Sequence, residues 1–142
     1  MNVLFVCHGN INRSVAGEIV LQDLKPDWQV KSAGVKTKGN VLTSKKMRLA
    51  LNHCGYGITS KRSTPITIND IEWSDVVFYM DDSNAKHLFQ KFGATTMDKA
   101  QKIAQFINQD KIPDPHYQKG FLEHIKVIKM LQTALGVFID RL

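Results

Sequence analysis

The opening of the chain constrains its fold more than any other segment. Residues 2–7, Asn-Val-Leu-Phe-Val-Cys, form a short apolar run rich in branched and aromatic side chains, as expected of a strand buried on both faces. Gly9 and Asn10 follow and favour a tight loop. Apolar residues then recur at helical spacing until Pro26, namely Val15, Ile19, Val20 and Leu24. Residues 2–25 therefore predict a strand, a loop and a helix, the unit from which parallel sheets are built.

The rest of the chain continues this alternation. Further strands are predicted at residues 28–33, 75–80 and 94–97, and helices at residues 44–54, 84–92, 99–107 and 121–138. The last helix has apolar residues at steps of three and four, from Phe121 to Phe138. Such alternation predicts an α/β fold in which helices cover both faces of a parallel sheet. The length of 142 residues and the 43% hydrophobic content predict a single three-layer domain spanning residues 1–142.

Charge and apolar pattern limit the partners and the location. Lys and Arg outnumber Asp and Glu by 19 to 13, a net charge of +6, which favours anionic partners such as phosphorylated substrates. The basic residues are scattered and no aromatic residues alternate with them, so nucleic acid binding is not expected. No run reaches the roughly 18–20 apolar residues of a membrane span and the apolar N-terminus is too short for a signal peptide, so we expect a cytoplasmic protein and no membrane partner. The histidines and cysteines lack metal-ligand spacing, so we expect neither a metal nor another cofactor. The sequence indicates no oligomeric state.

Residues 7–14, Cys-His-Gly-Asn-Ile-Asn-Arg-Ser, carry the strongest chemical signal. In an open parallel sheet, ligands bind where the carboxyl end of a strand gives way to a helix, and this is the first such junction. A loop of this length can point its backbone N–H groups inward as an anion nest, beside the positive end of the following helix. This nest and helix would favour the thiolate form of Cys7, which is the nucleophile that phosphoryl transfer needs. The predicted phosphate-binding residues are His8, Gly9, Asn10, Ile11, Asn12, Arg13 and Ser14.

Three side chains complete the predicted chemistry. Arg13 can hold two phosphate oxygens with its planar fork and stays charged while those oxygens gain charge in the transition state. Ser14 either caps the helix or donates a hydrogen bond to the Cys7 sulfur, and both interpretations are open at this point. Asp114 stands in Ile-Pro-Asp-Pro-His, where the two prolines stiffen the loop. We therefore predict that Asp114 is the general acid that protonates the leaving oxygen.

These motifs resemble those of the low-molecular-weight protein tyrosine phosphatases. That family has a first strand, the loop Cys-x-Gly-Asn-x-Cys-Arg-Ser, a helix, and an Asp-Pro loop near the C-terminal helix; the matching positions are Cys7, Gly9, Asn10, Arg13, Ser14, Asp114 and Pro115. The segments 32–34 and 75–81 resemble two further family segments, so the resemblance covers nearly the whole chain. It implies a four-stranded parallel sheet and metal-independent hydrolysis of phosphotyrosine or aryl phosphate esters through a cysteinyl-phosphate. It also implies catalytic roles for Cys7, Arg13 and Asp114.

The chain departs from the family pattern in the loop and around its mouth. Asn12 replaces a second loop cysteine, and Val15 replaces the usual proline at the helix start. Lys36 and His116 stand where the family commonly has aromatic residues, which leaves Tyr117 as the aromatic wall. The predicted substrate rim is therefore Lys36, His116 and Tyr117. From Lys36, Lys38, Lys61 and His116 we expect this mouth to be more basic and less aromatic than is usual.

Other proteins that resemble this loop fit less well. Thiol arsenate reductases relay oxidation through further cysteines, and outside Cys7 only Cys54 is present. Protein arginine phosphatases typically have a small threonine where this loop has Ile11, which favours aryl esters. Sugar-transport phosphocysteine subunits lack an arginine at the spacing of Arg13. A phosphate-binding regulatory module without turnover is an open alternative, because the rim is altered.

Overall fold

The described part of the chain contains twelve helices, strands and 3-10 turns. The computed structural model describes residues 1–57, 59–117 and 120–142, without the side chain of Tyr117. In chain order the elements are β1 (Asn2–Cys7), α1 (Arg13–Leu24), β2 (Gln29–Gly34), α2 (Lys45–His53), α3 (Ile68–Trp73), β3 (Val76–Tyr79), α4 (Asp82–Phe92), α5 (Ala94–Met97), β4 (Ala100–Lys102), the 3-10 turns η1 (Ile103–Ile107) and η2 (Pro115–Tyr117), and α6 (Phe121–Asp140).

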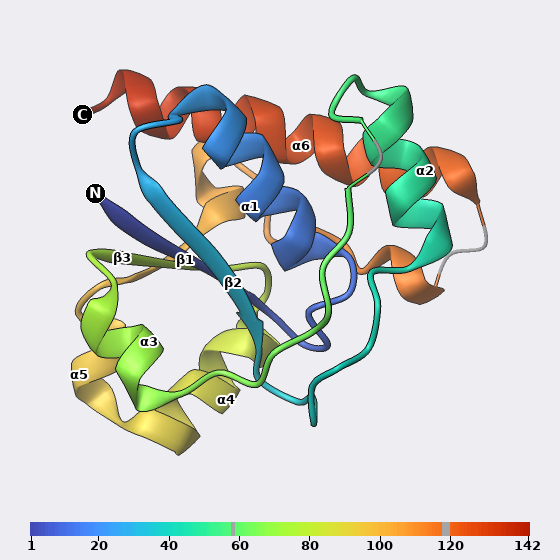
Figure 1. Ribbon diagram of the computed structural model, residues 1–142. Helices are drawn as coiled ribbons and strands as arrows, with labels where there is room; N and C mark the ends of the chain where they lie inside the picture. The colour runs from blue at the N-terminus through green and yellow to red at the C-terminus, as the bar shows by residue number, and fades with distance from the viewer. Residues whose placement is uncertain (58, 118–119) are drawn as a thin grey trace.

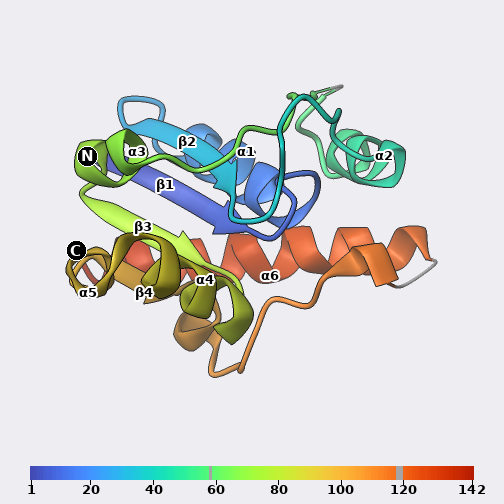
Figure 2. The same cartoon turned by 90° about the horizontal axis from the view of Figure 1, so that it is seen from below.

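The sheet has four parallel strands in the order β2-β1-β3-β4, which confirms the predicted fold class. β1 lies between β2 and β3 (Figure 2). Cys7 is opposite Gly34 of β2, and Val6 is opposite Tyr79 of β3. The chain turns from β1 to β2 on one side and later enters β3 on the other, so the strand order reverses at β1. A crevice opens at the carboxyl ends of strands where the order reverses. Cys7, the last residue of β1, lies at this point.

Alternate residues of β1 enter two separate cores. Val3 and Phe5 pack in the core shared with α1, α2 and α6, whereas Leu4 and Val6 pack in the core shared with α3 and α4. The helices accordingly cover both faces of the sheet, with α1, α2 and α6 on one side and α3, α4 and α5 on the other (Figure 1). All four side chains are fully buried, and burial of each contributes about 1.5–3 kcal/mol to folding. The strand that ends in Cys7 is therefore held firmly from both sides.

The predicted strand at residues 94–97 is wrong. These residues form α5, a single helical turn that follows directly on α4. Gly93, at φ +82°, ends α4 and begins α5, and Thr96 is buried on the inner side of the turn. Four residues are too few for periodicity to separate a strand from a helical turn.

The fourth strand lies instead within the helix predicted at residues 99–107. β4 pairs with β3 in the register Val77 to Ala100, and a helical turn begins only afterwards, at η1. β4 is a three-residue edge strand whose residues are all half-buried, so it carries little apolar pattern of its own. Its conformation comes from pairing with β3 rather than from local preference.

The long C-terminal helix is confirmed as α6, which packs against α1, α2 and η1. Helix α3 is not indicated by apolar spacing. Its sequence signal is a capping box, in which Thr67 accepts a hydrogen bond from the Asp70 N–H and the Asp70 side chain accepts one from the Thr67 N–H. In residues 1–57, 59–117 and 120–142, no helix combines the length and the apolar character that crossing a bilayer requires.

The contact between α1 and β1 yields a prediction about packing. A Cβ atom added to Gly17 of α1 would lie 2.5 Å from a ring carbon of the buried Phe5. Alanine improves helix propensity by about 1 kcal/mol, but overpacking a close-packed core costs about 1–3 kcal/mol. Gly17→Ala should therefore lower the free energy of unfolding by up to about 2 kcal/mol in urea titrations. Gly136→Ala in α6, where nothing lies within 4 Å of the added atom, is the matched control and should be neutral or stabilising. Equal effects of the two substitutions would contradict this account.

Candidate active site

The loop of residues 7–14 wraps around the sulfur of Cys7. The Sγ atom accepts a hydrogen bond from the Asn10 backbone N–H at 3.3 Å and lies 3.0 Å from Ser14 Oγ. Because Ser14 Oγ also accepts a hydrogen bond from the Asn10 amide at 2.8 Å, its own proton is available to the sulfur. The N-cap of α1 is Asn12, with no side-chain cap hydrogen bond. This geometry favours Ser14 as a donor to sulfur over Ser14 as a helix cap.

Asn10 holds the loop in shape from within. Its backbone has the left-handed φ of +56°, which asparagine tolerates better than most residues. Besides its bond to Ser14, its side-chain amide donates to Ser32 Oγ at 3.0 Å, and its carbonyl oxygen accepts from the Thr64 N–H at 3.0 Å. The side chain is fully buried, so each of these bonds offsets a desolvation cost. Asn10 thus joins the loop to β2 and to the segment before α3.

A second layer of polar side chains supports Ser32. Its hydroxyl donates to Glu18 at 2.6 Å, and the Lys61 ammonium donates to Ser32 Oγ at 3.1 Å and to its carbonyl oxygen at 2.9 Å. Burial lowers the pKa of Lys61, and the nearby Glu18 carboxylate opposes that shift. Lys61, expected near the substrate mouth, lines a separate hollow with Glu18 and Ser32 instead. The pattern of residues 7–14 gave no indication of this support.

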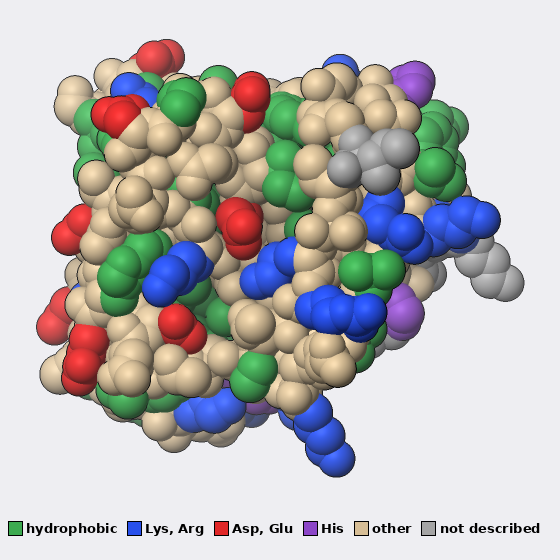
Figure 3. Space-filling view, viewed as in Figure 1, with side chains coloured by type: hydrophobic (Ala, Val, Ile, Leu, Met, Phe, Trp, Pro, Cys, Tyr) green, Lys and Arg blue, Asp and Glu red, His purple; other side chains and the backbone are tan. Residues whose placement is uncertain are grey.

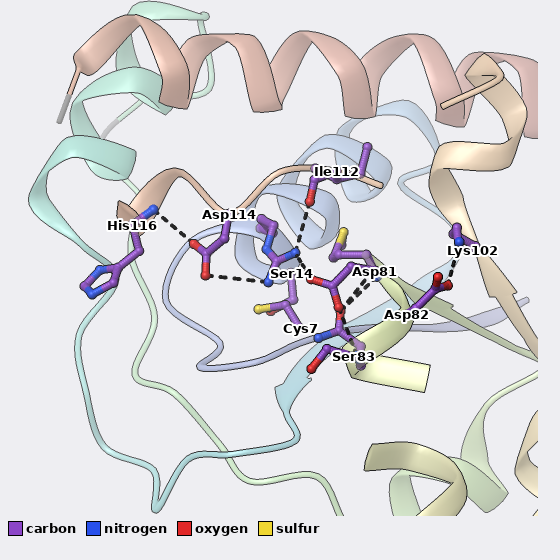
Figure 4. Close-up of polar contacts among 12 residues, drawn as sticks. Cys7, Ser14, Asp81, Asp82, Ser83, Lys102, Ile112, Asp114 and His116 are labelled. Atoms are coloured by element: carbon purple, nitrogen blue, oxygen red, sulfur yellow. Dashed lines mark hydrogen bonds and ion pairs between the residues drawn. The ribbon is translucent and has the colours of Figure 1, made fainter. Parts of the chain in front are cut away.

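Arg13 is buried between two carboxylates. Its side chain is 3% exposed; Nη1 donates to Asp81 Oδ2 at 2.7 Å and to the Ile112 carbonyl oxygen at 3.0 Å, and Nη2 lies 3.7 Å from Asp114 Oδ2 (Figure 4). Burial raises the pKa of Asp81, but the hydrogen bond and charge of Arg13 together with N–H groups of α4 outweigh it, so the pKa lies below the ordinary 3.8. The motif search missed Asp81 as a site residue. Its signal is its position, two residues after the end of β3, at the carboxyl edge of the sheet.

Asp114 closes the site from the loop before η2. Its Oδ1 accepts a hydrogen bond from the His116 backbone N–H at 3.0 Å, and its Oδ2 faces Arg13. Figure 4 shows its carboxylate between His116 and the Cys7 region. Together these groups enclose a cavity of about 180 Å³ whose lining residues are Cys7, His8, Gly9, Ile11, Asn12, Arg13, Asp114 and His116. The structure thus brings the three predicted catalytic side chains to one cavity.

The remaining predicted residues take different positions. Asn10 and Ser14 support the loop from behind the cavity, and Asn12 accepts a hydrogen bond from the Ser44 hydroxyl before α2. Lys36 is exposed and its backbone N–H donates to the His8 carbonyl oxygen, but its side chain does not line the cavity. The side chain of Tyr117 lies outside the described part of the structure. Within residues 1–57, 59–117 and 120–142, no three His, Cys, Asp or Glu side chains converge as a metal site.

Comparisons with known proteins point to one family. The family model described as low molecular weight phosphotyrosine protein phosphatase matches residues 2–142. The phosphatase of that name from Sus scrofa is 33% identical over 129 residues, which cover 82% of this chain and 80% of the relative. The crystal structure of a protein tyrosine phosphatase from Entamoeba histolytica superimposes with a TM-score of 0.89 at 29% identity, covering 99% of this chain and 96% of that one. An arginine phosphatase, YwlE from Geobacillus stearothermophilus, superimposes with a TM-score of 0.85 at 26% identity, covering 99% and 91%.

The ion pair between Arg13 and Asp81 predicts a stability that depends on pH. Asp81→Asn keeps the oxygen that caps α4 but removes the charge facing a buried guanidinium. At neutral pH it should lower the free energy of unfolding by about 1–3 kcal/mol. Because the folded pKa of Asp81 lies below 3.8, this contribution is complete above pH 3.8 and disappears as the pH falls through the lower folded value.

Urea unfolding of both proteins at pH 7 and at steps down to pH 3 measures this difference. Asp82→Asn is the matched control, because Asp82 is 76% exposed and pairs with Lys102 at the surface. It should change the free energy of unfolding by less than about 0.5 kcal/mol. A loss for Asp81→Asn that stays constant over the whole range would show that the charge of Asp81 is not its cause.

Proposed function

The chain belongs to the low molecular weight phosphotyrosine protein phosphatase family, and on this basis we propose that it hydrolyses phosphotyrosine-type monoesters through a phosphorylated Cys7. One observation carries the proposal: a cavity of about 180 Å³ is lined by a thiol, a guanidinium and a carboxyl group. These are the nucleophile, the anion clamp and the general acid that two-step phosphoryl transfer needs. All three are side chains of this chain.

In the first step the Cys7 thiolate attacks phosphorus. A sulfur–phosphorus bond forms, the ester phosphorus–oxygen bond breaks, and the leaving oxygen takes a proton from Asp114. The Asn10 N–H and the Ser14 hydroxyl contact the sulfur and hold it at the floor of the cavity, where it can meet the phosphorus. The neighbouring N–H groups of the loop and the start of α1 favour the negative charge of the phosphoryl oxygens.

In the second step water replaces sulfur on the phosphorus. Asp114, now ionised, accepts a proton from the water, and the Cys7 thiolate leaves as inorganic phosphate forms. The Ser14 hydroxyl, 3.0 Å from the sulfur, stabilises the departing thiolate. The same contact therefore assists both steps.

Arg13 binds the phosphoryl oxygens that gain charge in both transition states. Its Nη1 is fixed by Asp81 and by the Ile112 carbonyl oxygen, which leaves Nη2 directed toward the cavity side, near Asp114. An incoming dianion offers this nitrogen a stronger partner than the 3.7 Å contact with Asp114. The Asp114 carboxyl group is then released from Arg13 to serve the leaving oxygen.

We assign phosphorylated proteins or small aryl phosphates as substrates. Ile11 gives the cavity an apolar wall, on which an aromatic ring packs well and a guanidinium finds no acceptor. A reducing compartment keeps a nucleophilic cysteine in its reduced form, so we infer that the protein acts in the cytoplasm. We also infer that residues 1–142 act as one domain. His116 adds a polar side to the mouth of the cavity.

Hydrolysis of p-nitrophenyl phosphate near pH 6 tests the proposed roles. Cys7→Ser should abolish turnover, and Asp114→Ala should lower kcat by roughly 10²- to 10⁴-fold, the range for general acid catalysis. The loss in Asp114→Ala should be larger for phosphotyrosine than for p-nitrophenyl phosphate, because the tyrosine oxygen is the more basic leaving group. An equal loss for both esters would assign Asp114 a structural role. A folded wild-type protein without turnover would instead support a phosphate-binding module.

Ile11 is tested by exchanging the phosphorylated residue. The wild-type protein should hydrolyse a phosphotyrosine peptide with a kcat/KM at least about tenfold above that for the matched phosphoarginine peptide. Ile11→Thr removes apolar area and adds a hydroxyl, so it should reduce this preference. Phosphate release from the two peptides measures it, and an equal or reversed preference in the wild-type protein would contradict the assignment.

A further inference from the structure

An open groove lies beside the cavity, between α2 and the start of α6. It has a volume of about 630 Å³ and is lined by Lys45, Lys46, Leu49, Asn52, His53 and Phe121. We call it the α2–α6 groove. Leu49 is 50% exposed and Phe121 is 37% exposed, although both are large apolar residues. The Phe121 and His53 rings pack edge to face with their centroids 5.8 Å apart, so together they form one wall of the groove.

The α2–α6 groove is joined to the cavity through both of its walls. On one side, the Ser44 N–H donates to the Ile11 carbonyl oxygen at 3.2 Å, and Lys45 follows as the first residue of α2. On the other side, His116 lines the cavity from η2, which packs against α6, and Phe121 is the first residue of α6. A polypeptide with one residue in the cavity therefore passes close to this groove when it leaves the mouth on that side.

The charges around the α2–α6 groove select the kind of segment that fits it. Of the described residues that line it, two are lysines and none is acidic. On the face shown in Figure 3, Lys and Arg side chains gather over α2 and the adjoining loops. Acidic side chains are attracted to such a rim, while Leu49 and Phe121 offer apolar area to a large apolar side chain. A volume of 630 Å³ suits a few side chains rather than a second globular surface.

We propose that the α2–α6 groove binds the segment of a phosphoprotein substrate that flanks its phosphotyrosine, and that it selects segments with a large apolar residue next to acidic residues. This inference rests on the proposed phosphatase function. It adds a recognition surface that selects among phosphoproteins. The cavity alone, at about 180 Å³, has room for little more than the phosphorylated side chain.

Steady-state kinetics with matched substrates test the proposal. The probes are phosphotyrosine peptides that carry a Leu-Asp-Glu segment on either side, the same peptides with Ser-Asn-Gln, and p-nitrophenyl phosphate. The wild-type protein should prefer one Leu-Asp-Glu peptide over its Ser-Asn-Gln partner by roughly three- to tenfold in kcat/KM. Leu49→Ser and Lys45→Glu should each remove most of that preference and change p-nitrophenyl phosphate hydrolysis by less than about twofold.

Two control variants and a charge exchange sharpen the result. Leu24→Ser and Lys91→Glu alter a 45% exposed leucine on α1 and an exposed lysine on α4, and both should leave the preference intact. The effect of Lys45→Glu should weaken with rising salt, and a Leu-Lys-Lys peptide should gain with this variant relative to the wild-type protein. These outcomes separate the α2–α6 groove from a general effect of surface charge.

Several outcomes would overturn the proposal. One is equal kcat/KM for both peptide types in the wild-type protein, and another is a loss in the variants that extends equally to p-nitrophenyl phosphate. Sedimentation that shows a dimer broken by Leu49→Ser would assign the α2–α6 groove to a second copy of the chain. Vesicles with anionic lipid that bind the wild-type protein but not Lys45→Glu, with peptide kinetics unchanged, would assign it to a membrane surface. A folded wild-type protein that hydrolyses none of the substrates would refute the phosphatase function itself.

Discussion

The whole site depends on one buried residue, Asn10, whose side chain makes hydrogen bonds that the backbone of the loop cannot make. The left-handed backbone at Asn10 breaks any regular hydrogen-bond ladder, and a loop next to a hydrophobic core has no water to replace it. The Asn10 side chain supplies the missing partners, since it bonds to Ser14 in α1, to Ser32 in β2 and to the Thr64 N–H. Because its own N–H bonds to the Cys7 sulfur, Asn10 sets both the position of this sulfur and the shape of the loop.

Charge balance around Arg13 links the loop to the opposite side of the crevice. The Arg13 guanidinium is 3% exposed, so its buried positive charge needs carboxylates and hydrogen-bond acceptors close by. Asp81, just beyond β3, supplies one carboxylate, Asp114 supplies another, and the Ile112 carbonyl oxygen accepts a hydrogen bond. These partners come from two segments far apart in the sequence. The positions of Arg13 and Asp114 are therefore coupled, because the Asp114 carboxylate lies 3.7 Å from the Arg13 guanidinium. In the proposed reaction, substrate phosphate would enter this arrangement as a further anion and replace the 3.7 Å contact with Asp114 rather than the 2.7 Å hydrogen bond with Asp81.

The sequence was sufficient to predict features that come from local chemistry. The strand β1, the left-handed backbone of Asn10 and the helix α6 each follow from the conformations that their residues prefer. β4 could not be predicted in the same way, because three half-buried residues become a strand only by pairing with β3. The catalytic candidates were found because thiol, guanidinium and carboxyl groups have recognisable spacing. Glu18 and Lys61 were not, since their roles arise from tertiary contacts with Ser32.

The position of Arg13 as the first residue of α1 has a consequence for how such a site can vary. Successive residues of an α-helix are turned by about 100° around its axis. A single insertion between Cys7 and Arg13 would therefore rotate the guanidinium out of the crevice unless the loop bulged to absorb it, and the tightly bonded Asn10 leaves little slack for a bulge. The number of residues in the loop therefore determines the direction in which the Arg13 side chain leaves the helix. Diversity in a protein built this way is confined to side chains within the loop and to the surfaces around its mouth.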